Sequence, residues 1–194
     1  ADLREPTLVS ASADRTVRVW DAARQRKLVT LRGHEGAVAC AQFAPDAAQV
    51  ASVGADGTLR WWDWRAARET AKHRVHGAIP LSCAFSSQNA ALLATANSDG
   101  TVRLFDVRQR LPAGALRGHN APVTCARFSR SLPGARLASA CQDGSVKVWD
   151  VRAGATLAVL NAHSGPVWHC LEEGDTVWSC GQDCKALGWR LEVQ

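Results

Sequence analysis

One short motif occurs five times along this chain of 194 residues, and its fixed spacing constrains the fold more than any other feature. In each copy a Ser or Thr is followed four residues later by an Asp, and six residues after that by a Trp or Phe. The five copies are Ser10, Asp14, Trp20; Ser52, Asp56, Trp62; Thr95, Asp99, Phe105; Ser139, Asp143, Trp149; and Ser179, Asp183, Trp189. Successive aromatic positions are 42, 43, 44 and 40 residues apart. Such a period predicts an array in which every copy forms one supersecondary unit.

Histidines repeat with the same period, and the chain between the markers has the pattern of short strands. The histidines, each of which precedes the aromatic residue of its own copy, are His34, His76, His119 and His163. In the fourth copy, residues 136–140 are largely apolar and residues 145–150 alternate between apolar and polar. The Asp143-Gly144 pair between them predicts a hairpin turn in which both central residues have positive φ. We therefore expect an all-β fold.

The Gly-His and Trp-Asp dipeptides at this spacing resemble those of the WD-repeat (WD40) β-propeller family, and the likeness covers residues 8–191. The resemblance implies antiparallel blades of four strands. It implies complete blades at residues 37–74, 79–116 and 122–160, with partial blades at 1–32 and 166–191. Because propellers usually close and blades bury their faces against neighbours, we expect residues 1–194 to be a segment of a larger propeller. A longer parent protein would supply the missing blades; a partner chain is the alternative.

Ser, His and Asp could be mistaken for a nucleophilic triad. An enzyme needs one such site, whereas this set recurs along the chain, and the resemblance implies a structural tetrad in each blade. The implied tetrads are His34, Ser52, Asp56, Trp62; His76, Thr95, Asp99, Phe105; His119, Ser139, Asp143, Trp149; and His163, Ser179, Asp183, Trp189. An unsatisfied buried polar group costs about 1–3 kcal/mol, which explains the constant spacing. We expect the tetrad of the third copy, which contains Phe105, to be weaker, because Phe105 lacks an indole donor.

The seven cysteines do not indicate a metal site. Four of them fall on the expected first strand of a blade, where a small apolar side chain fits a core: Cys40, Cys83, Cys125 and Cys170. Cys180 and Cys184 near His169 lack the four-ligand spacing of a zinc site. We expect no metal, no cofactor and no small-molecule substrate. An odd number of cysteines without a signal peptide predicts a reducing compartment, the cytoplasm or nucleus, and no apolar run suggests a membrane partner.

The net charge of +5 raises the alternative of a ribonucleoprotein subunit that binds RNA through a basic face. Four of the basic residues, however, precede the repeat aromatic by two positions and are first of all charges of the scaffold: Arg18, Arg60, Arg103 and Lys147.

A second periodic set of arginines follows the Trp-Asp or Phe-Asp dipeptide. Arg65, Arg108 and Arg152 end the sequences WDWR, FDVR and WDVR, in turns expected on the bottom rim of the blades. This ending resembles a motif of propellers that dock onto the adaptor of cullin-RING ubiquitin ligases, where the planar guanidinium suits carboxylates. A substrate receptor of such a ligase is therefore an alternative function. The same ending is also common in propellers with no such role.

The loops on the opposite, top face supply the candidate partner-binding residues, because recognition varies on loops that a rigid scaffold positions. These residues do not repeat in type: Glu35, Ser98, Asn120, Gln142, Ser164, Trp168 and Gln182. The sequence predicts a non-catalytic scaffold that mediates protein–protein interactions within a larger protein. A propeller hydrolase, the enzyme alternative, would call for a single unrepeated nucleophile or metal cluster, and the sequence presents neither.

Overall fold

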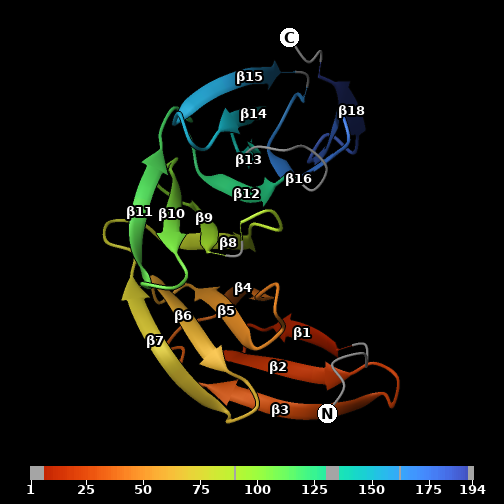
Figure 1. Cartoon of the computed structure of the whole chain (residues 1–194). Coiled ribbons are helices and arrows are strands. Elements are labelled where there is room, and N and C mark those ends of the chain that lie inside the picture. Colours follow the sequence, from red (N-terminus) through yellow and green to blue (C-terminus); the bar gives the residue numbers. More distant parts are fainter. Residues whose placement is uncertain (1–6, 90, 130–135, 162, 192–194) are drawn as a thin grey trace. The chain divides into compact units, whose positions relative to one another are not determined.

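The computed structural model describes residues 7–89, 91–129, 136–161 and 163–191. Residues 1–6 of the partial blade expected at 1–32, residue 90 of the blade expected at 79–116 and residues 130–135 of the blade expected at 122–160 lie outside the described residues. The described part consists of antiparallel strands joined by turns, which confirms the predicted all-β fold class (Figure 1). None of its segments is a helix with the length and apolarity to cross a membrane. The chain divides into two compact units, residues 1–83 and 84–194.

The first unit contains two sheets whose strands follow one another in chain order. The three-stranded sheet consists of β1 (Thr7–Ala11), β2 (Thr16–Asp21) and β3 (Arg26–Arg32). The four-stranded sheet consists of β4 (Val38–Phe43), β5 (Gln49–Gly54), β6 (Thr58–Asp63) and β7 (Arg68–Arg74). Val17 and Val19 of β2 pack in one apolar cluster with Val38, Val50 and Trp62 of the second sheet. Alternating strand residues thus build a core from both sheets.

The second unit continues the same strand order, and the division between the units falls within the first strand of its first sheet. That sheet consists of β8 (Pro80–Phe85), β9 (Leu92–Asn97), β10 (Val102–Asp106) and β11 (Leu111–Leu116). The next consists of β12 (Val123–Phe128), β13 (Arg136–Cys141), β14 (Ser145–Asp150) and β15 (Ala155–Asn161). The last consists of β16 (Val167–Glu173), β17 (Thr176–Gly181) and β18 (Ala186–Arg190).

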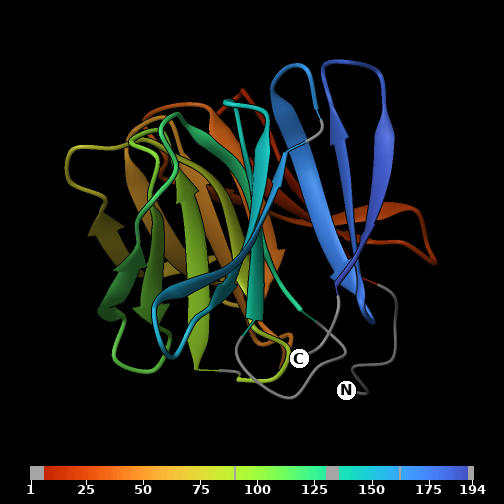
Figure 2. The same cartoon turned by 90° about the horizontal axis from the view of Figure 1, so that it is seen from above.

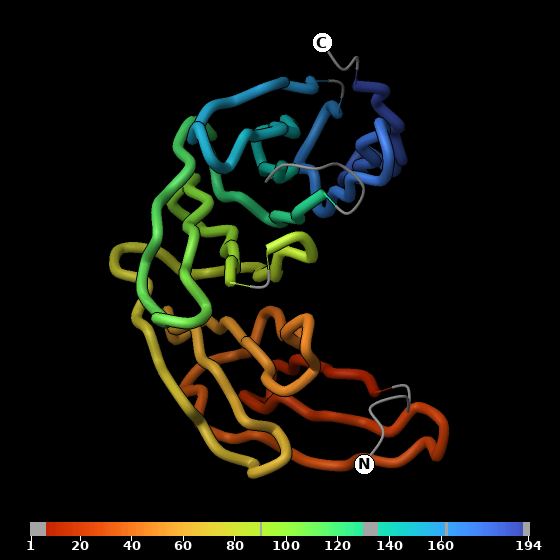
Figure 3. The backbone as a smooth tube through the Cα atoms, viewed as in Figure 1, coloured from red at the N-terminus to blue at the C-terminus, as the bar shows by residue number. Residues whose placement is uncertain are grey.

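Apolar clusters connect neighbouring sheets of this second unit. Leu104 of β10 packs with Leu137 and Trp149 of the next sheet. Val148 on that sheet packs in turn with Val167 and Val177 of the last sheet. The up-and-down path of each sheet can be followed in the backbone tube, and the three strands of the last sheet lie side by side in the view from above (Figures 2 and 3).

The turn at the repeated Asp differs from the sequence prediction in one respect. Only its second central residue has positive φ: 72° at Gly57, 78° at Gly100 and 88° at Gly144. The Asp keeps an ordinary φ because its side chain stabilises the turn, as in Asp56, whose Oδ1 accepts the backbone N–H of Thr58 at 3.1 Å. Cys184 takes the left-handed conformation in the last sheet with φ of 59°, so this turn forms there without glycine.

A second irregularity repeats at the aromatic position and was not predicted. The register between the last two strands of a sheet shifts at the aromatic residue in four sheets: at Val19/Trp20, Trp61/Trp62, Leu104/Phe105 and Val148/Trp149. Five residues beyond each aromatic, the following turn contains a left-handed residue: Gln25, Ala67, Arg110 and Gly154. A bulge of this kind bends a strand and increases its twist.

Candidate functional site

The Ser, Asp and Trp of one repeat and the His that precedes it come together at one end of a sheet. In the second repeat, His34 lies in the loop before β4, Ser52 on β5, Asp56 in the β5–β6 turn and Trp62 on β6. Antiparallel pairing brings the loop and the turn to the same end of the sheet. All four side chains thus meet toward the end of the sheet at which the β5–β6 turn lies.

In the second repeat these side chains form a continuous hydrogen-bonded chain. The Trp62 indole N–H donates to Ser52 Oγ at 2.8 Å. His34 Nε2 lies 2.7 Å from Ser52 Oγ, and His34 Nδ1 lies 2.9 Å from Asp56 Oδ2. Because a carboxylate only accepts, Nδ1 carries the proton and the Ser52 hydroxyl donates to Nε2. Every polar group of this buried set is therefore satisfied.

The surroundings of His34 and Asp56 in the second repeat determine the charge that each of them carries. Burial lowers the pKa of His34, although the neighbouring Asp56 acts against this. Burial alone would raise the pKa of Asp56, but hydrogen bonds from the Glu35 backbone, the Thr58 hydroxyl and the His34 ring outweigh it, and the pKa falls to about 2. The Arg60 guanidinium forms ion pairs with Asp56 Oδ2 at 3.4 Å and with Glu69 Oε2 at 2.6 Å. The carboxylate is thus held ionised beside a neutral imidazole.

The fifth repeat has the same arrangement. His163 Nε2 lies 2.8 Å from Ser179 Oγ, to which the Trp189 indole donates at 3.0 Å. His163 Nδ1 lies 2.9 Å from Asp183 Oδ1, and this contact lowers the pKa of Asp183.

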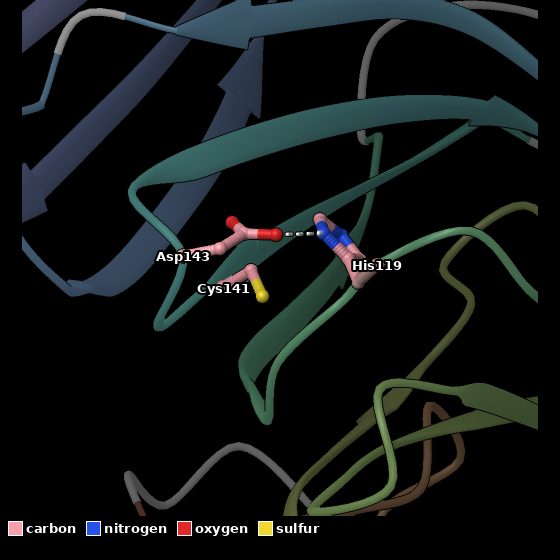
Figure 4. A group of neighbouring side chains, drawn as sticks. All are labelled: His119, Cys141 and Asp143. Atoms are coloured by element: carbon pink, nitrogen blue, oxygen red, sulfur yellow. Dashed lines mark ion pairs between the residues drawn. The ribbon is translucent and has the colours of Figure 1, made fainter.

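The fourth repeat keeps only half of this chain. The Trp149 indole donates to Ser139 Oγ at 2.8 Å, and His119 Nε2 lies 2.7 Å from the same oxygen. His119 Nδ1, however, lies 3.8 Å from Asp143 Oδ2, which is too far for a hydrogen bond (Figure 4). Burial lowers the pKa of His119 to about 4. The Ser145 hydroxyl lies 3.2 Å from His119 Nδ1 and donates to Asp143 Oδ1 at 2.6 Å, so it bridges the two residues in place of a direct His–Asp bond.

Cys141, the last residue of β13, explains this wider separation. The second and fifth repeats have glycine at the same offset from the repeat Ser. A Cβ on Gly54 would lie 2.8 Å from His34 Nδ1 and 3.2 Å from Asp56 Oδ1, and one on Gly181 would meet His163 and Asp183 at similar distances. A side chain at this position thus enters the space between His and Asp. This role of Cys141 was not predicted from the sequence, although the glycine at the same offset in two other copies is a signal for it.

The third and first repeats depart further from the implied tetrad. The Thr95 hydroxyl donates to Asn97 Oδ1 at 3.2 Å, and the Asn97 amide donates to the carbonyl oxygen of Thr101 at 3.0 Å. Asn97 stands at the offset of Gly54 and Cys141, so in this repeat an amide side chain, and not a histidine, accepts the hydrogen bond of the Thr95 hydroxyl. His76 is exposed. In the first repeat the Trp20 indole donates to Ser10 Oγ at 2.9 Å.

The candidate partner-binding residues are mostly exposed. Six of them are exposed and lie in the loops before β4, β12 and β16, in the neighbouring Asp turns, or on β16: Glu35, Asn120, Gln142, Ser164, Trp168 and Gln182. Ser98 is half-buried. Trp168 has 48% of its surface exposed. Its ring is therefore available for contact with another molecule.

The three periodic arginines are also exposed: Arg65, Arg108 and Arg152. Asp106 Oδ1 accepts the backbone N–H of Arg108 at 2.7 Å, and Asp150 Oδ1 accepts that of Arg152 at 2.8 Å. Asp106 and Asp150 thus fix the turns that present the Arg108 and Arg152 guanidiniums. Arg65 lies over the Trp64 ring at 4.5 Å.

Each four-stranded antiparallel sheet contains a buried aromatic residue, a buried Ser or Thr and an Asp turn at constant spacing. Such sheets are the blades of a β-propeller repeat protein. The sequence matches the WD40 family, described as "WD domain, G-beta repeat", over residues 4–21, 25–63, 68–106 and 111–150. The chain belongs to this family.

Individual relatives match shorter stretches. The chain is 47% identical over 57 residues to WD repeat and SOCS box-containing protein 1 of Danio rerio, which is 29% of this chain and 14% of that protein. It is 43% identical over 58 residues to small ribosomal subunit protein RACK1y of Oryza sativa subsp. japonica, 30% of this chain and 17% of that protein. It is 37% identical over 70 residues to a guanine nucleotide-binding protein subunit beta of Arabidopsis thaliana, 36% of this chain and 19% of that protein. The matches thus span under a fifth of the relatives' length.

Proposed function

We propose that this chain is a non-catalytic scaffold that binds other proteins as part of a larger protein. One observation carries the proposal: the serines that could act as nucleophiles of a Ser-His-Asp triad are engaged in the structure itself. The Ser52, Ser139 and Ser179 hydroxyls are buried, and each accepts an indole N–H and contacts an imidazole. A hydroxyl enclosed in this way has no access to a substrate.

Exposed, unrepeated side chains beside these buried sets are the proposed contact surface. In the second unit, Gln142 and Gln182 flank the Asp turns, and Trp168 projects from β16. Their supporting turns are fixed by hydrogen bonds such as that from Ser145 N to Asp143 Oδ1 at 2.9 Å. Rigid turns lower the entropic cost of binding, and exposed Trp is common among residues that dominate binding energy. Two of the relatives are named as subunit proteins, which agrees with a role in assemblies.

The test compares partner capture by the full chain and two matched variants. The first carries Gln142→Glu, Trp168→Ala and Gln182→Glu; the second carries Arg108→Glu and Arg152→Glu on the other end of the sheets. We expect the first variant to lose partners in quantitative affinity purification and the second to retain them, with circular dichroism unchanged for both. Equal capture by all three proteins would overturn this choice of surface.

A ligase receptor is the second candidate, and the exposure of the periodic arginines favours it. Arg108 and Arg152 lie at equivalent positions in turns that Asp side chains fix. Their guanidiniums suit carboxylates of an acidic partner. Binding of the purified full chain to a cullin-RING adaptor, and its loss on changing Arg65, Arg108 and Arg152 to Glu, is the expected result. Unchanged binding, or none in either protein, removes this candidate.

RNA binding through the repeated basic residues is less favoured. Arg18 pairs with Asp14, Arg60 with Asp56 and Glu69, and Arg103 with Asp99. These guanidiniums are therefore already neutralised by carboxylates of the scaffold.

A further inference from the structure

We propose that His119, Cys141 and Asp143 form a binding site for a divalent cation that favours nitrogen and sulfur ligands, with zinc as the biological example. One potential ligand atom from each residue lies within 4.8 Å of the other two. Figure 4 shows the Asp143 carboxylate directed at the His119 ring and the Cys141 side chain next to this pair, between the loop before β12 and the β13–β14 turn. The three residues do not form a compact metal-binding motif in the sequence, where only Cys180 and Cys184 were candidate ligands.

The separation of the His119 and Asp143 ligand atoms is close to that around a tetrahedral ion. Bonds of about 2.0–2.3 Å from zinc to nitrogen, oxygen and sulfur place neighbouring ligand atoms about 3.3–3.7 Å apart. His119 Nδ1 and Asp143 Oδ2 are separated by 3.8 Å. The equivalent pairs of the second and fifth repeats are separated by 2.9 Å, a hydrogen-bond distance that leaves no room for an ion. The fourth repeat alone among these three combines the wider separation with a thiol.

The carboxylate of Asp143 is also less engaged than its counterparts. The Glu35 and Ser164 backbone N–H groups donate to Asp56 Oδ2 and Asp183 Oδ2 at 2.9 and 3.3 Å. Within the described part of the chain, Asp143 Oδ2 receives no such bond. Lys147, which stands where Arg60 contacts Asp56, donates instead to the Gly118 carbonyl oxygen at 2.6 Å. This leaves a carboxylate oxygen directed at the imidazole and beside the Cys141 thiol.

The surroundings support each ligand in its role. His119 coordinates through Nδ1, which exchanges its 3.2 Å contact with Ser145 Oγ for the metal. Its Nε2–H donates to Ser139 Oγ, now 2.7 Å away, as metal-bound histidines usually donate their second N–H. The Cys141 thiol, 3.2 Å from the Ala121 carbonyl oxygen, releases its proton to water, and the thiolate sulfur bonds the metal. The His119 side chain is 1% exposed and that of Asp143 26% exposed, so the ion enters from the Asp143 side, where water supplies the fourth ligand.

Cobalt(II) is the probe for this site, because a thiolate bound to it gives an ultraviolet charge-transfer band and tetrahedral cobalt gives visible bands. The purified full chain is treated with a chelator, dialysed and titrated with Co²⁺. We expect one equivalent to bind with both signals, and Zn²⁺ to displace it. In Cys141→Gly, which introduces the residue of the second and fifth repeats, we expect the charge-transfer band to vanish. Its affinity should fall by more than the roughly 10–100-fold that loss of an outer-shell partner costs.

A Cys180→Ser, Cys184→Ser double variant is the matched control, because these two thiols are the exposed ones. It should keep the band and the affinity. A band that persists in Cys141→Gly, or that disappears from the control, places the metal elsewhere and overturns the proposal. The absence of any band from the native chain at excess cobalt also overturns it. Circular dichroism of each variant, compared with the native chain, shows whether a lost band reflects a lost ligand or a lost fold.

Discussion

Cys141 occupies the space that glycine leaves open in the second and fifth repeats, and the His–Asp distance of the fourth repeat is longer. The separation is 3.8 Å between His119 and Asp143, against 2.9 Å between His34 and Asp56. A carboxylate close to an imidazole stabilises its protonated form and raises its pKa. The side chain at this one offset therefore sets the electrostatics of the buried histidine.

Replacing Cys141 with glycine should raise the pKa of His119 above its native value of about 4, because Asp143 can then approach Nδ1. Titration of the histidine ring signals by NMR measures this change. Cys141→Ala retains the Cβ, so it should leave the pKa close to the native value. A similar pKa in the glycine and alanine variants would contradict the steric explanation.

His119 should also make stability depend on pH. Its pKa is about 4 in the folded chain against 6.5 ordinarily, so the unfolded chain binds the proton more readily between these values. The free energy of unfolding should therefore decrease as the pH falls from about 6.5 to about 4, by up to about 3 kcal/mol. Urea titrations at several pH values measure this decrease.

His119→Gln is the control for that measurement. It lowers stability at every pH but should show a smaller decrease over the same interval. An identical pH dependence in the two proteins would exclude His119 as its source.

At the scale of the strands and turns, four sheets place a left-handed residue at the same point of the turn after the aromatic strand. The residue is Gly154 in one sheet and Ala67, with φ of 52°, in another. A side chain makes this conformation unfavourable, whereas glycine adopts it readily. The effect of a side chain at this position can therefore be tested both by replacing Ala67 with Gly and by replacing Gly154 with Ala.

Ala67→Gly should raise the free energy of unfolding by about 0.5–1 kcal/mol, because relief of the left-handed strain exceeds the entropic cost of glycine. Gly154→Ala should lower it by about 1 kcal/mol. A Cβ on Gly154 would meet no atom within 4 Å, so backbone conformation alone is tested. Denaturant unfolding of both variants gives the two values. Changes of the same sign would contradict this explanation.

The sequence predicted the strands well because their signals are local. Apolar alternation identified residues 145–150, which form β14 (Ser145–Asp150). The register shifts at the aromatic residues were not predictable, since they depend on pairing between strands. The Asp-Gly turns were predicted with two positive φ angles and have one, because the Asp side chain already bonds the following backbone.

The candidate site was partly predictable for the same reason. Spacing placed His34, Ser52, Asp56 and Trp62 in one set, and the structure brings these four together. Spacing also grouped Thr95 with His76, yet Thr95 bonds Asn97. The offset that decides these outcomes carries glycine in two copies, which is a weak sequence signal, and the reason for that glycine appears only in the three-dimensional packing.

At the scale of the whole molecule, stability should vary from sheet to sheet. The inner strand β13 is almost entirely buried, whereas β18, an edge strand, alternates between exposed and half-buried residues. Strands with few buried contacts open at lower free energy. The chain should therefore not behave as one uniform cooperative unit.

Native-state hydrogen exchange measured by NMR tests this difference. Amides of β17 that pair with β18 should exchange through openings of lower free energy than amides of β13 that pair with β14. Strand β9, which is also largely buried and inner, is the matched comparison for β13. Equal free energies of opening for β13 and β17 would contradict the expectation.

The position held by Gly54, Asn97, Cys141 and Gly181 also bears on how such an array evolves. A glycine codon becomes a cysteine codon by a single base change, and the altered copy has intact neighbours on the same chain. A repeat can therefore acquire a new side chain beside its buried histidine in one mutational step, while the other copies keep their own geometry.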